Sequence, residues 1–161
     1  MSIAFNSEDQ TGAPRRNLLA YSTQFSTRFL LETVFFSSPG LYTLEFAPLE
    51  SDFLRAVNSK KFDAYIIDTS DSEGEERFRL LREITALKPK GITRILLLLD
   101  KMPPPNADHM ESFGPLCFLE CFFTRQRLLG SLNRIFDMKD TGSRVKADDK
   151  FFDVTVFSKN K

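Results

Sequence analysis

The chain has 161 residues, enough for one domain with short extensions, and its 42% hydrophobic content favours a packed globule over a disordered chain. The 22 basic and 22 acidic residues cancel, so the net charge does not point to a nucleic-acid partner or to an anionic membrane surface. No apolar stretch approaches the roughly 20 residues of a membrane span, and the N-terminus lacks the basic region and apolar core of a secretory signal. We therefore expect a cytoplasmic protein.

Short apolar runs alternate with segments of helical periodicity along most of the chain. Residues 1–15 are polar, and we expect them to form a flexible arm. The apolar runs predict strands over residues 18–20, 41–46, 62–68, 92–99 and 116–119. Helical spacing and Gly/Pro breakers predict helices over about residues 22–36, 49–57, 75–87, 106–113 and 124–138. On the first helix we place four apolar residues on the buried face: Phe25, Phe29, Leu30 and Val34.

Five strands alternating with five helices indicate the fold class. This order is typical of a doubly wound α/β protein with a parallel sheet and helices on both faces. The run at 92–99 is almost continuously apolar, as expected for a strand that is covered on both sides. In such sheets, functional side chains gather where the carboxyl ends of the strands meet.

Asp68 stands at one of these carboxyl ends, directly after the apolar run that begins at Phe62. Residues 18–20 supply a first strand, and residues 118–129 supply a last strand, a turn and the start of a last helix. The ordered set resembles the receiver domain of bacterial response regulators over about residues 16–138. The resemblance implies a five-stranded sheet in flavodoxin-like order, with Asp68 at the position of the phosphoacceptor.

The metal-binding positions of that family are altered in this chain. Receiver domains carry two acidic residues directly after the first strand, where they hold magnesium. The matching residues here are Tyr21 and Ser22. Magnesium prefers hard oxygen ligands, above all carboxylates, in octahedral geometry. A serine hydroxyl and a phenol are poor replacements, so we expect no metal site and no cofactor.

Two further family positions are altered as well. The threonine or serine that ends the fourth strand is replaced by Leu99, or by Asp100 if the alignment shifts by one residue. The Lys-Pro pair that ends the fifth strand is replaced by Cys121 and Phe122. Phosphoryl transfer depends on positioning and charge neutralisation, and these changes remove both a hydroxyl and a cation. The resemblance is therefore to a degenerate receiver, or pseudo-receiver.

Three alternatives to a plain structural role remain for this edge. In the first, a histidine kinase phosphorylates Asp68 through an atypical metal site. In the second, an acidic cluster of Asp68, Asp71 and Asp100 binds a cation weakly. In the third, a small ligand fills the vacated metal pocket. Its expected lining is Tyr21, Ser22, Asp68 and Phe122.

Other reactive residues have simpler interpretations. Cys117 and Cys121 are too few for a structural zinc site, which takes four ligands, so we expect buried, reduced thiols. His109 is the only histidine and falls in a polar stretch, which favours a surface role. The aromatic pair Phe122-Phe123 supplies an extra ring at this rim, which can plug the vacated site or present a contact surface. We expect plugging, because an exposed aromatic pair promotes association.

Residues 139–161 form a charged linker followed by a strand-like tail. Phe152, Val154 and Val156 share one face of that predicted strand. The tail can extend a sheet edge in its own chain or in a second chain, and we favour a dimer or partner contact.

These observations predict a non-enzymatic signalling or scaffolding module that acts by protein–protein contact independently of phosphorylation. By resemblance, the contact face spans about residues 106–138, with Arg125, Gln126 and Arg127 as candidate polar contacts. We expect a protein partner, including a second copy of the chain. We expect no membrane partner and no nucleic-acid partner, since the residues after Met138 are too few for a helix-turn-helix domain.

Overall fold

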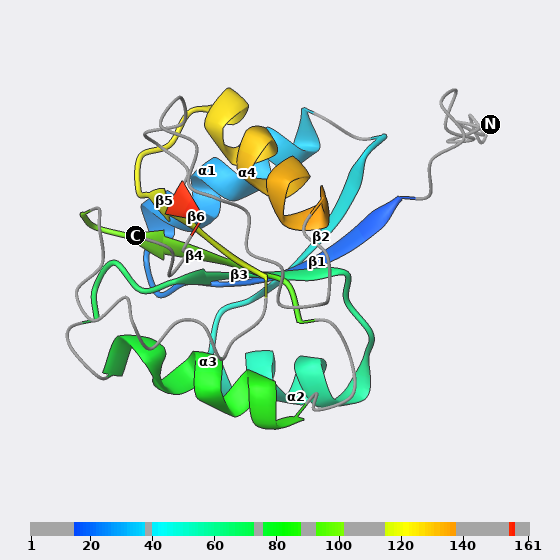
Figure 1. Cartoon of the computed structure of the whole chain (residues 1–161), viewed down its shortest axis with the longest axis vertical. Helices are drawn as coiled ribbons and strands as arrows, with labels where there is room; N and C mark the ends of the chain where they lie inside the picture. Colours follow the sequence, from blue (N-terminus) through cyan, green and yellow to red (C-terminus); the bar gives the residue numbers. More distant parts are fainter. Residues whose placement is uncertain are drawn as a thin grey trace.

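A parallel sheet forms the centre of the computed structural model (Figure 1), which describes residues 15–37, 40–72, 76–87, 93–101, 115–137 and 155–156. The strand order is β2-β1-β3-β4-β5-β6, and the first five strands run parallel. This order confirms the predicted receiver-type α/β fold. The strands are β1 (Arg16–Tyr21), β2 (Tyr42–Ala47), β3 (Ala64–Asp68), β4 (Ile95–Leu99), β5 (Leu116–Glu120) and β6 (Thr155–Val156).

Helices cover both faces of the sheet (Figure 1). One layer holds α1 (Phe25–Phe36) and α4 (Arg125–Asp137), and the other holds α2 (Glu50–Ser59) and α3 (Glu76–Leu87). The helix expected over residues 106–113 lies outside the described residues, as does His109. Within the described part of the chain, no helix is both long enough and apolar enough to cross a membrane.

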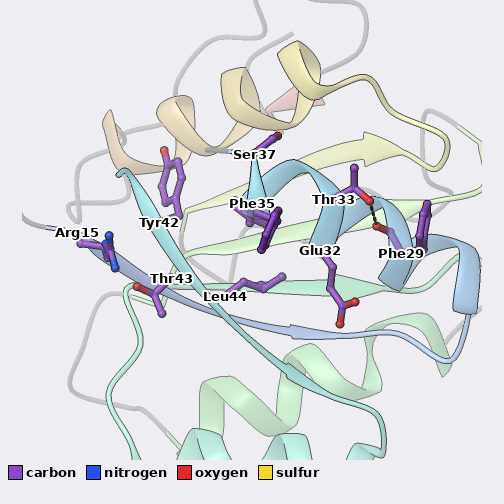
Figure 2. Close-up of a pocket in the computed structure, with 10 residues that line it drawn as sticks. Arg15, Phe29, Glu32, Thr33, Phe35, Ser37, Tyr42, Thr43 and Leu44 are labelled. Atoms are coloured by element: carbon purple, nitrogen blue, oxygen red, sulfur yellow. Dashed lines mark hydrogen bonds between the residues drawn. The ribbon is translucent and has the colours of Figure 1, made fainter. Parts of the chain in front are cut away.

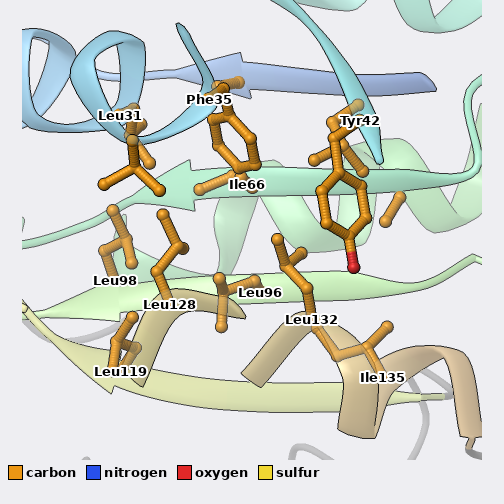
Figure 3. Packing of buried hydrophobic residues seen from close by; sticks show 14 of the residues in the cluster. Leu31, Phe35, Tyr42, Ile66, Leu96, Leu98, Leu119, Leu128, Leu132 and Ile135 are labelled. Atoms are coloured by element: carbon orange, nitrogen blue, oxygen red, sulfur yellow. The ribbon is translucent and has the colours of Figure 1, made fainter. Parts of the chain in front are cut away.

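The central strands are buried on both sides because each face has its own helix layer. Every residue of β3 and of β4 is buried. Successive side chains alternate between the two layers, so Ile66 packs with α1 and α4, while Ile67 packs with α2 and α3. Figure 3 shows the first of these cores, where Leu128, Leu132 and Ile135 of α4 meet the strands.

The buried face of α1 differs from our prediction. The buried residues are Thr27, Leu31, Val34 and Phe35, and Leu30 is partly buried. Phe25 and Phe29, which we placed inside, are 81% and 60% exposed. The helix is apolar around most of its circumference, so its periodicity does not fix which side faces the sheet. Packing against β1 and β3 makes that choice.

The tail strand pairs within its own chain. β6 lies antiparallel to β5, with Val156 opposite Cys117 and Thr155 opposite Phe118. Our preference for a dimer or partner contact through this strand is therefore wrong for the two residues described. A tethered strand meets the β5 edge at a high effective concentration, which favours pairing within the chain. Phe152 and Val154 lie outside the described residues.

Candidate functional site

The carboxyl ends of β1, β3 and β5 bring together a buried polar cluster around Asp68. Ser22 Oγ donates a hydrogen bond to Asp68 Oδ2 at 2.6 Å. The backbone N–H of Ser70 donates to Asp68 Oδ1 at 2.9 Å, and the Cys121 thiol lies 3.6 Å from the same oxygen. Asp68 and Ser22 are each only 4% exposed. Protein donors therefore engage both oxygens of the carboxylate.

The local backbone explains how Ser22 reaches Asp68. Ser22 follows β1 directly, and the backbone N–H of Gln24 donates to its Oγ at 2.9 Å. This bond holds the hydroxyl in the turn before α1, where Asp68 Oδ2 at 2.6 Å is a closer acceptor than the backbone oxygen of Gln24 at 3.3 Å. Asp68 similarly caps the loop after β3 by accepting the backbone N–H of Ser70.

Cys121 is neutral where receiver domains carry a lysine. Burial is the main cause that raises the pKa of the Cys121 thiol to about 11, so the thiol stays protonated at neutral pH. The hydroxyls of Ser70 and Thr27 also bond this thiol. Burial likewise raises the pKa of Cys117 to about 12, and both cysteines are free. The site contains a weak hydrogen-bond donor in place of a cation.

Thr27 is the member of this cluster that the sequence interpretation missed. It lies on the buried face of α1 and is 5% exposed. A polar residue at helical spacing from Leu31 and Val34 was the available signal. The signal was lost because Phe25 and Phe29 were assigned to that face instead.

Tyr21 belongs to the opposite side of the sheet. Its ring lies 5.7 Å from the ring of Phe53 on α2, in the core formed with α2 and α3. Burial raises the pKa of the Tyr21 phenol, and the nearby carboxylates of Glu50 and Asp71 raise it further. The two residues that replace the family's acidic pair are therefore separated, since only Ser22 contacts Asp68.

The end of β4 supplies no hydroxyl. Leu99 is completely buried among the residues that pack with α2 and α3, and Asp100 is exposed. Thr69, one residue after Asp68, is buried, but its hydroxyl donates to the backbone oxygen of Leu98 at 2.9 Å. Neither alignment of this position restores the family's phosphoryl-binding hydroxyl.

The donor set does not fit magnesium. Receiver chemistry implies that cation, which needs several hard oxygen ligands around one point. Among the residues that the structure describes, no three His, Cys, Asp or Glu residues are close enough to hold a metal ion. Asp71, a member of the acidic cluster that we considered, accepts a hydrogen bond from the Thr23 hydroxyl. These residues therefore do not form the cation site of the second alternative.

The aromatic pair after β5 splits between core and solvent. Phe123 is buried in the core beneath α1 and α4, whereas Phe122 is 81% exposed. The expected plug is wrong for Phe122, which is exposed. Its backbone has a φ of 63°, which turns the chain sharply and sends consecutive side chains in different directions. Tyr21 thus packs against α2 and Phe122 is exposed, which gives no support to the ligand-binding alternative.

Comparison with known proteins agrees with the fold. The chain matches no protein-family model and no curated protein sequence. Solved structures do match: the chemotaxis protein CheY4 of Vibrio cholerae has a TM-score of 0.63 at 20% identity, covering 76% of this chain and 99% of that one. A response regulator from Thermotoga maritima gives 0.62 at 17% identity, with 76% and 98% covered. The chain has the receiver fold.

A third structure extends this likeness beyond single-domain regulators. The signal receiver domain of an HD domain-containing protein from Pseudomonas fluorescens Pf-5 has a TM-score of 0.60 at 23% identity. The match covers 77% of this chain and 96% of that one. The TM-scores establish the receiver architecture. At these identities the side chains around Asp68 must be interpreted from this chain alone.

Proposed function

We propose that this protein is a pseudo-receiver, a non-enzymatic signalling or scaffolding module that acts by protein–protein contact without phosphorylation. The observation that carries the proposal is the engagement of Asp68. Its two carboxylate oxygens accept hydrogen bonds from Ser22 and from the Ser70 backbone, and the residue is 4% exposed. The burial of Asp68 leaves a phosphodonor little access to a carboxylate oxygen.

The charges around Asp68 support the same proposal. A phosphorylated aspartate brings additional negative charge, which receiver chemistry balances with a divalent cation and a lysine. Here the nearest side chains are the hydroxyl of Ser22 and the protonated thiol of Cys121. Neutral donors stabilise one carboxylate, but they do not neutralise a phosphoryl group.

The start of α4 is the surface we assign to a partner. Arg125, Gln126 and Arg127 are exposed there, and the first turn of the helix contains no acidic residue. Cations near the positive end of a helix dipole cost about 0.3–1 kcal/mol each. The exposed positive charge of this turn suits contact with an acidic protein surface.

Intact-mass measurement after incubation with magnesium and acetyl phosphate tests the loss of phosphorylation. We expect no mass gain for the wild-type chain. A triple variant, Tyr21→Asp, Ser22→Asp and Cys121→Lys, rebuilds the family's charges and serves as the positive control. A phosphoryl gain in the wild type that Asp68→Asn abolishes would establish the phosphoacceptor alternative instead.

Quantitative comparison of co-purifying proteins tests the contact face. We expect Asp68→Asn to retain the partners of the wild type, because the amide preserves the shape of the carboxylate. The double variant Arg125→Glu/Arg127→Glu should lose them. The opposite pattern, with partners lost only in Asp68→Asn, would contradict a phosphorylation-independent role.

A further inference from the structure

The outer face of α1 carries an aromatic stripe, which we define as Phe25, Phe29 and Phe36. At 3.6 residues per turn, these three positions fall within about 40° of one another around the helix axis. The rings of Phe25 and Phe29 stack with their centroids 6.3 Å apart. Phe36, at the far end of the helix, is 89% exposed. Three phenylalanines aligned on a solvent face need a partner to exclude water from them.

An open groove lies beside this stripe, between α1 and the edge strand β2 (Figure 2). Its volume is about 930 Å³. Figure 2 shows Phe29 and Glu32 on α1, with Leu44 on the neighbouring strand. In the described sheet β2 pairs only with β1, so one side of the strand lies toward the surface. The groove therefore offers an apolar channel parallel to an exposed helix.

We propose that a second copy of this chain occupies the groove, with its α1 antiparallel to the first and related by a two-fold axis near residue 30. A buried phenylalanine contributes about 150–250 Å² of surface, so the exposed parts of the aromatic stripe offer on the order of 450 Å² per copy. Two copies together would bury about 900 Å² of aromatic surface, and a stable interface needs about 1,200–2,000 Å². The flanking side chains of α1 and β2 supply the remainder.

The charged residues beside the aromatic stripe, Arg28 and Glu32, are self-complementary, which favours a second copy over another protein. Arg28 Nε donates to Glu32 Oε1 at 2.8 Å within the helix, and both side chains are about half exposed. A two-fold axis near residue 30 places Arg28 of one copy opposite Glu32 of the other, and the reverse. A guanidinium has five N–H donors, so it can bond a carboxylate in each copy. The same axis brings the Phe25 end of one stripe to the Phe36 end of the other.

This inference does not depend on the state of Asp68 or on the arginines of α4. It also differs from our sequence-based expectation of a dimer through the tail, because β6 pairs with β5 of its own chain. The other helix layer has no comparable stripe among its described residues, since Arg79 bonds the carboxylates of Glu50, Glu76 and Glu83 there.

Sedimentation velocity of the full chain, from about 1 to 200 μM, tests the proposal. We expect a monomer–dimer equilibrium that Phe29→Glu weakens at least tenfold. Phe122→Glu is the matched control, because it also replaces an exposed phenylalanine, and it should leave the dimer unchanged. A wild-type chain that stays monomeric over this range, or a Phe29→Glu chain that dimerises as well as the wild type, would overturn the proposal.

Charge reversal provides a second test, which distinguishes the proposed dimer from non-specific hydrophobic association. Arg28→Glu places two glutamates opposite each other in a homodimer, and Glu32→Arg places two arginines opposite each other. Each single variant should therefore dimerise at least tenfold more weakly than the wild type. An equimolar mixture of the two restores both opposite-charge contacts, so it should form a heterodimer. Absence of the heterodimer would overturn the antiparallel arrangement.

Discussion

The two helix layers cover opposite faces of one sheet, but their outer surfaces are built from different chemistry. On the outer side of α2 and α3, Arg79 lies between Glu50, Glu76 and Glu83, with nitrogen–oxygen distances of 2.6–2.8 Å. On the outer side of α1, three phenylalanines face solvent. Water solvates the first surface readily and the second poorly. The outer surface of α2 and α3 is therefore covered by ion pairs that water solvates, whereas the outer surface of α1 leaves aromatic rings in contact with water.

The Asp68 cluster is linked to α1, the helix that carries the exposed aromatic stripe. Thr27 on α1 bonds Cys121, which lies in the turn between β5 and α4 and contacts Asp68. A hydrogen-bonded cluster thus ties α1 to the end of β3 and to the start of α4. Substitutions in each region should change the free energy of unfolding by different amounts, from the largest expected effect to the smallest.

Replacing a buried and an exposed phenylalanine should give the largest difference in the free energy of unfolding. Phe53 is fully buried and its ring contacts the rings of Tyr21 and Tyr65, so Phe53→Ala should lower the free energy of unfolding by about 3–5 kcal/mol. Phe25→Ala should change it by less than about 0.5 kcal/mol, because the ring is already exposed. Urea unfolding at low protein concentration measures both values. Equal losses would contradict the assignment of Phe25 to the outer face.

The Asp68 cluster should contribute to the stability of the fold even if Asp68 is not phosphorylated. Asp68→Ala removes the 2.6 Å acceptor of the buried Ser22 hydroxyl, leaving only the 3.3 Å contact to the backbone oxygen of Gln24, and should cost about 1–3 kcal/mol. Asp68→Asn retains an acceptor oxygen and should cost less. Thermal unfolding of the three proteins gives the comparison. A neutral Asp68→Ala would show that the cluster is dispensable for folding.

The turn at Phe122 should be strained. A non-glycine residue at a φ of 63° costs roughly 1–2 kcal/mol, and the exposed ring returns little of it through packing. Phe122→Gly should therefore raise the free energy of unfolding by about 1 kcal/mol. Denaturant titration of Phe122→Gly and of Phe122→Ala isolates the backbone effect. The alanine variant keeps a Cβ, so its free energy of unfolding should not rise.

Alkaline pH should weaken the Asp68 cluster through Cys121. The pKa of this thiol is about 11 in the folded protein against an ordinary value of 9.0, so the unfolded chain loses its proton first. The stabilising contribution is complete below about pH 8 and is lost as the pH rises from about 9 to about 11. Comparison with Cys121→Ala under reducing conditions removes the contributions of the tyrosines and Cys117. The variant should lose less stability over that range, and an identical slope would contradict the assignment.

Several site residues were predictable because they depend on strand ends. The run ending at Asp68 and the element order place Asp68, Ser22 and Cys121 at one edge of a parallel sheet, and the structure brings these three together. Tyr21 was harder to place. It neighbours Ser22 in sequence, but the alternation of a strand sends the two side chains to opposite layers.

The sequence by itself determined the alternation of elements, the central apolar strands and the residues Tyr21, Ser22, Leu99 and Cys121 at the ends of the strands. These features depend on local patterns of period 2 and 3.6 and on residue identity. Only the tertiary structure decided which side of α1 faces the sheet, since apolar residues occur on several sides of this helix and its periodicity selects none of them. It also decided that Phe123 is buried while Phe122 is exposed, because one positive φ redirects the chain. The pairing of β6 with β5 is likewise tertiary, as it joins segments far apart in sequence.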